Sequence, residues 1–174
     1  MHLLIVALFL SAVVTATIFD SMTSDVIPLR EDVVSGDIAC TSECVLLCKL
    51  TSGCIGGRYQ PKLRTCGLTI QHGVSPVMYY KKSEGNSADV TFGIPCKTTS
   101  TMQKNTNLMI YGYDVKIYVT DSEASCANDC AKTPWCRSVD FNIPNSQCTL
   151  SGISSVNQPL RDGYNHWNNW HRSC

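Results

Sequence analysis

The chain carries one cysteine pattern twice. Four cysteines spaced C-x3-C-x5-C-x11-C recur 82 residues further along, so each cysteine of the first set has a counterpart in the second. The two sets are Cys44, Cys48, Cys54 and Cys66, then Cys126, Cys130, Cys136 and Cys148. The match extends to an aromatic position, because Tyr59 aligns with Phe141. A fixed period of this kind indicates a duplicated structural unit.

The first residues are typical of a secreted protein. Residues 3–14 form a mostly apolar run that is too short to cross a bilayer, which takes about 20 residues. Val14 and Ala16 then offer the small residues of a cleavage site. We therefore predict a signal peptide over residues 1–16. The 11 cysteines favour an oxidising, extracellular compartment, and without a second apolar run we expect no membrane insertion.

The repeat and a short polar stretch predict the domain organisation. We expect a first module over residues 17–82, a linker over 83–87 with the sequence SEGNS, and a second module over 88–174. Modules of this size bury a smaller fraction of their surface than larger domains do. Disulfide staples are therefore expected.

Each module is predicted to contain one helix. Thr120 and Glu123 have the spacing of a capping box, and Cys126 and Cys130 would then share one helix face. In the first module Asp37 is a plausible cap for the equivalent helix.

Strands are expected to follow. Residues 136–150 alternate apolar and polar side chains on both sides of a turn, which indicates a hairpin. Residues 108–119 and 164–174 are also predicted as strands. The predicted fold class is α+β, with two small disulfide-stapled modules, each a short antiparallel sheet packed on one helix.

Three kinds of chemistry compete for the cysteines. Zinc sites prefer C-x2-C knuckles or close Cys/His clusters, whereas the repeat has C-x3-C and C-x5-C. A catalytic thiolate needs a positioned base, but His72, His166 and His171 have no counterparts in the repeat. Disulfides are therefore predicted, with no metal, no cofactor and no enzymatic activity.

The spacing C-x3-C-x5-C, followed by a strand with an aromatic residue and then C-x-L, resembles the PAN/apple domain family. The resemblance implies a sheet cradling one helix, and helix cysteines bonded to the hairpin. It also implies a bond joining the two ends of the second module, whereas the first module resembles the two-disulfide version. The implied bonds are Cys44–Cys66, Cys48–Cys54, Cys126–Cys148, Cys130–Cys136 and Cys96–Cys174.

The resemblance also implies a binding function. We expect a secreted recognition or adhesion protein that binds extracellular proteins or carbohydrates. The alternative is a structural component of an extracellular matrix, mucus or coat, and a small secreted enzyme or protease inhibitor is a third class. The 14 basic and 14 acidic residues form no basic stripe, which argues against nucleic acid as a partner.

One aromatic face is a candidate for ligand binding. If residues 164–174 form an unbroken strand, Trp170 and Tyr164 point inward with Cys174. Trp167 and His171 then point outward, where a tryptophan suits stacking on a sugar or a protein. The alternative is that Trp167 packs on the linker or on the first module.

Cys40 is the odd cysteine. Its counterpart is Ser122, so the position is expected in the first turn of the helix, where cysteine is not needed for folding. An unpaired thiol in an oxidising space tends to find a partner. We predict an intermolecular disulfide through Cys40, in a homodimer or with another secreted protein. Cys40 could instead be buried and inert, or pair with Cys96 and release Cys174.

Overall fold

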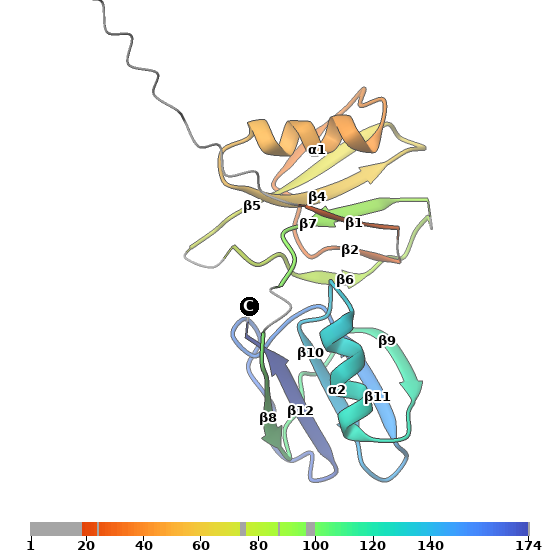
Figure 1. Ribbon diagram of the computed structural model, residues 1–174, viewed down its shortest axis with the longest axis vertical. Helices are drawn as coiled ribbons and strands as arrows, with labels where there is room; N and C mark the ends of the chain where they lie inside the picture. Colours follow the sequence, from red (N-terminus) through yellow and green to blue (C-terminus); the bar gives the residue numbers. More distant parts are fainter. Residues whose placement is uncertain (1–18, 24, 74–75, 87, 97–99, 174) are drawn as a thin grey trace, which may run out of the picture.

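The computed structural model describes residues 19–23, 25–73, 76–86, 88–96 and 100–173 (Figure 1). The predicted signal peptide, residues 1–16, and Cys174 lie outside these residues. No helix in the described part of the chain is both long and apolar enough to cross a membrane.

The first module is a five-stranded antiparallel sheet with one helix. Its elements are β1 (Asp20–Thr23), β3 (Val33–Ser35), α1 (Thr41–Leu50), β4 (Cys54–Gln60), β5 (Thr65–Ile70) and β7 (Val90–Gly93). The strand order is β1-β7-β4-β5-β3. Figure 1 shows α1 lying across this sheet, on the side away from the second module.

The second module repeats this topology strand for strand. Its elements are β8 (Met102–Thr106), β9 (Asp114–Val119), α2 (Glu123–Lys132), β10 (Ser138–Asn142), β11 (Gln147–Ser151) and β12 (Trp167–Arg172). The order β8-β12-β10-β11-β9 matches that of the first sheet. The predicted α+β class is confirmed: each module is a small antiparallel sheet with one helix on it.

Disulfides tie each helix to the hairpin beneath it. The two cysteines of each helix, at i and i+4, face the sheet together. The first is bonded to the second strand of the hairpin, and the second is bonded near the start of the first strand. The structure contains four of the bonds that the resemblance implies: Cys44–Cys66, Cys48–Cys54, Cys126–Cys148 and Cys130–Cys136. These cysteines lie in or against the two module cores, beside apolar sheet residues such as Leu68 and Leu150.

The predicted boundary between the modules is wrong. Residues 83–87 were expected to link the modules, but β7 follows them and lies between β1 and β4 of the first sheet. Phe92 of β7 is fully buried in the first core, which explains why this strand returns to the first module. The described part of residues 83–87 is therefore a loop of the first module, and the second sheet begins at Met102.

The predicted helix caps also need correction. Ser122 caps α2, because its hydroxyl accepts a hydrogen bond from the Ser125 N–H at 3.1 Å. Thr120 lies too early in the chain, and the Glu123 carboxylate instead accepts from Trp170 Nε1 at 2.6 Å. In the first module, Cys40 rather than Asp37 is the N-cap residue.

Two predicted strands are shorter than expected. Only residues 114–119 of the predicted 108–119 are strand, and Met109 forms an isolated bridge to Arg161. The final strand covers residues 167–172 rather than 164–174. Gly112 has a φ of 88°, so the chain turns before β9 can begin.

A third, two-stranded sheet lies between the modules. It pairs β2 (Val26–Pro28) with β6 (Tyr80–Lys82), both from the first module. An apolar cluster surrounds it and includes Val115 and Trp135 of the second module. The Tyr80 N–H also donates to the Gly152 carbonyl at 3.0 Å, so the two modules are joined by apolar packing and by a backbone hydrogen bond.

Arg137 is buried in this junction, with 1% of its surface exposed. Its Nε donates to the Met78 carbonyl of the first module at 3.3 Å, and Nη1 donates to the Pro134 carbonyl of the second at 2.8 Å. Its guanidinium lies 5.5 Å from the Tyr80 ring centre. Burial lowers the pKa of Arg137 to about 10, so the side chain stays charged at neutral pH while it bridges the modules.

Candidate functional site

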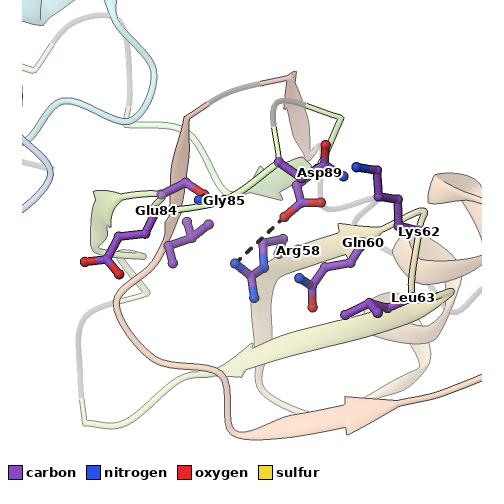
Figure 2. Close-up of a pocket in the computed structure, with 10 residues that line it drawn as sticks. Arg58, Gln60, Lys62, Leu63, Glu84, Gly85 and Asp89 are labelled. Atoms are coloured by element: carbon purple, nitrogen blue, oxygen red, sulfur yellow. Dashed lines mark hydrogen bonds and ion pairs between the residues drawn. The ribbon is translucent and has the colours of Figure 1, made fainter.

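The first module has a cavity of about 430 Å³ on the sheet face opposite α1 (Figure 2). Tyr59 of β4 packs toward the helix, so its neighbours Arg58 and Gln60 project from the other face. The loop after β6 forms the facing wall with Glu84 and Gly85. The cavity therefore lies between β4 and an exposed loop.

The lining mixes charges of both signs with apolar groups. Arg58 and Lys62 are basic, Glu84 and Asp89 are acidic, and Leu63 at the rim is 66% exposed. Such a balanced set offers hydrogen-bond donors and acceptors together. It suits a ligand that is polar without a large net charge.

Two carboxylates orient the central arginine. Arg58 Nε lies 2.9 Å from Glu31 Oε1, and Arg58 Nη1 lies 4.0 Å from Asp89 Oδ2. The Arg58 side chain is 15% exposed, and the Asp89 side chain 4%. These pairs fix the guanidinium on the cavity wall, where it remains partly accessible.

A glycine makes the Glu31 contact possible. Gly67 of β5 is directly opposite Arg58 in the sheet. A Cβ at Gly67 would collide with the Glu31 carboxyl group and lie 3.0 Å from Glu31 Cγ. The missing side chain therefore lets Glu31 cross the sheet to reach Arg58.

The equivalent face of the second module is closed. The repeat offset places Asp140 at the position of Arg58, and Asp140 is fully buried. Its Oδ1 accepts from Asn169 Nδ2 at 2.8 Å, and its carboxylate accepts from the Ile110 N–H at 3.2 Å. The segment around Ile110 therefore covers this face, so the two modules differ at the same sheet position.

Burial raises the pKa of Asp140 to about 7, against the opposing effect of its hydrogen bonds. The unfolded chain releases this proton near pH 4, whereas the folded chain retains it to about pH 7. The contribution of Asp140 to the free energy of unfolding is thus complete below pH 4 and decreases as the pH rises to 7. We expect Asp140→Asn to abolish this decrease. Denaturant unfolding of both proteins from pH 4 to 8 measures it, and parallel pH profiles would contradict it.

The structure places the predicted ligand-binding residues on one side of β12. Trp167 and His171 share the strand face of Asn169, opposite Trp170, which packs against the core. Both Trp167 and His171 are half-buried rather than exposed, and Asn105 Nδ2 lies 3.2 Å from His171 Nδ1. Their role in ligand binding stays a prediction.

The remaining predicted cysteines are Cys40, Cys96 and Cys174. Cys40 is exposed and free, so neither the buried alternative nor the Cys40–Cys96 pairing is found. Cys96 is disulfide-bonded. The predicted partner of Cys96, Cys174, lies outside the described residues. Elsewhere in the described ranges, no group of three or more His, Cys, Asp or Glu residues could hold a metal ion.

Sequence reasoning missed the Arg58 cavity. A signal was present, because the repeat aligns Arg58 with Asp140 and Gly67 with Thr149, each a change in chemical character. The loop that completes the cavity was interpreted as a linker, so its proximity to β4 could not be foreseen.

The second module is similar to a known domain family. Residues 96–174 match the family model of the PAN domain. The chain is also similar to a solved structure of the two N-terminal apple domains of Toxoplasma gondii microneme protein 4, with 17% sequence identity. That match covers 86% of this chain and 87% of the other, with a TM-score of 0.34. No curated protein matches the sequence. The second module is thus similar to PAN domains.

Proposed function

We propose that the protein is a secreted, non-enzymatic recognition protein that binds an extracellular protein or carbohydrate. PAN and apple domains typically serve protein or carbohydrate binding and adhesion. The observation that carries the proposal is the cavity beside Arg58, which presents donors, acceptors and an apolar rim. The four disulfides among the described residues, two in each small module, support an extracellular location.

We further infer that the first module is a divergent copy of the PAN domain. It has the strand order of the second module, and in both modules the helix directly precedes the hairpin. Its two disulfides have the same sequence separations, 22 and 6 residues, as those of the second module. Divergence has left Arg58 and an open cavity where the second module has a buried carboxylate.

The recognition function is tested by presenting the mature chain to arrays of glycans and secreted proteins. We expect Lys62→Ala to weaken binding to the identified ligand about fivefold, since Lys62 lines the cavity and an exposed charged contact contributes up to about 1 kcal/mol. Trp167→Ala tests the rival surface on β12. Lys132→Ala, on the exposed end of α2, serves as the matched control.

The outcomes distinguish the Arg58 cavity from the β12 surface, and a recognition function from a structural one. Loss of binding in Trp167→Ala but not in Lys62→Ala would move the site to the second module. An absence of array binding together with detergent-resistant assembly would instead favour the structural alternative, a matrix, mucus or coat component.

We also propose that Cys40 forms an intermolecular disulfide. Its thiol is exposed and has no intramolecular partner, and its counterpart in the second module is the capping Ser122, so no structural role requires sulfur there. Non-reducing electrophoresis of the secreted protein should show a band of higher mass that collapses on reduction and is lost in Cys40→Ser. A wild-type monomer whose Cys40 alkylates without denaturant would refute the linkage.

A further inference from the structure

A second cavity, of about 270 Å³, lies where the two modules meet. Its walls are mainly apolar and come from both modules: Leu29, Ile55, Ile70, Val77, Tyr79 and Val156. Ile55 is 5% exposed, and Val156 is 80% exposed, so the cavity has a buried side and an open side. Concave, mostly apolar sites at domain interfaces are favoured positions for small ligands.

Arg30 is the charged side chain that lines this cavity, and His72 is the other basic residue of the lining. Both lie at the rim, with side chains 66% and 56% exposed, and no carboxylate of the described residues lines the cavity. Asp32 stands behind them and is 9% exposed. It pairs with Arg30 Nε and lies 3.2 Å from His72 Nε2, which holds the Arg30 guanidinium and the His72 ring at the rim.

This arrangement leaves donors for a ligand. Asp32 Oδ2 also accepts from the Ile70 N–H at 2.9 Å, so Asp32 is held firmly to β5. Only the Nε of Arg30 is used by Asp32, and its Nη groups donate no hydrogen bond among the described residues. A guanidinium held in this way is suited to bind a carboxylate.

We propose that this cavity binds a small aliphatic monocarboxylate, with its chain among the apolar walls and its carboxylate on Arg30. The chain would displace water from Ile70, Val77 and Val156, while the charged end stays at the exposed rim. The site is separate from the recognition cavity beside Arg58, which shares none of its lining residues.

A free monocarboxylate fits this lining better than a peptide does. A peptide main chain needs hydrogen-bond partners along its length, and the uncharged polar side chains here are few. The Thr69 hydroxyl already donates to the Arg30 carbonyl at 2.7 Å, which leaves Asn157 and the Tyr79 hydroxyl. One charged contact and an apolar pocket are what a fatty-acid-like ligand requires.

Octanoate is the probe for this proposal. Titration of the isotope-labelled mature protein, followed by NMR, should show saturable shifts at the Ile70 and Val77 methyl groups. We expect Arg30→Gln to weaken octanoate at least tenfold and to leave the weaker binding of octan-1-ol unchanged. Octylammonium should bind less well than octanol, because the rim is basic.

Two exposed valines provide a matched pair of variants. Val156→Asp places a carboxylate on the cavity wall and should weaken octanoate, whereas Val34→Asp alters a valine on β3 that is 63% exposed and lies outside the lining. The amide spectrum of each variant reports its folding, and the array ligand of the first module should bind all of them equally.

Three results would overturn the proposal. Octanoate shifts that do not saturate, or that map away from the junction, would show that the cavity takes no carboxylate. Unchanged octanoate affinity in Arg30→Gln would remove the charged contact. Tighter binding by a peptide with a C-terminal leucine than by octanoate would assign the cavity to a peptide terminus instead. None of these results bears on the recognition cavity.

Discussion

Replacing Gly152 with alanine should lower the free energy of unfolding by about 3 kcal/mol, at the upper end of the usual range for overpacking. A Cβ at Gly152 would collide with the Tyr80 carbonyl oxygen and lie 2.7 Å from the carbonyl carbon. Both are main-chain atoms and cannot rotate away as a side chain can. The backbones must move apart, which also weakens the hydrogen bond from the Tyr80 N–H to the Gly152 carbonyl.

Denaturant unfolding under non-reducing conditions measures the stability change, and small-angle scattering reports whether the modules separate. The matched control is Gly36→Ala, because a Cβ there meets nothing within 4 Å. That variant should stay within about 0.5 kcal/mol of the wild type. Equal stability of the two variants would show that the junction is loose at this point.

The second large effect is expected from removing Cys126–Cys148. This bond joins α2 to β11 across a sequence separation of 22 residues. In the chain-entropy model, opening a loop of that size costs about 3.4 kcal/mol. Replacing both cysteines with alanine should therefore remove much of the stability of a small module, whose total is on the order of 5 kcal/mol.

Cys130–Cys136 provides the comparison within the same module. All four cysteines are fully buried, so the cavities left by alanine are similar. Its separation is 6 residues, for which the same model gives about 2.4 kcal/mol. Chemical unfolding of both double-alanine variants should rank the longer bond first. The reverse order would mean that packing around the sulfurs, rather than loop length, sets their contribution.

The residues that form the junction between the modules could not be predicted from the sequence. β2 and β6 are three residues each, too short for their alternation to predict a strand. Arg137 directly follows Cys136, and arginine is a residue type usually found at the surface, yet it is almost fully buried. Its environment depends on Met78, 59 residues earlier in the chain, and no local pattern records that contact.

The α+β class and the repeat were predictable from the sequence alone. Both depend on relations between residues that are close in the chain. Cysteines at i and i+4 share a helix face, and the alternating apolar and polar side chains of the hairpin come a few residues after the helix. Three features were found only in the folded chain: β7 pairs in the first sheet, loop 83–86 closes a cavity over Arg58, and a second cavity lies between the modules. The physical reason is that strand pairing and cavity formation join segments far apart in the chain, where burial of groups such as Phe92 outweighs local composition.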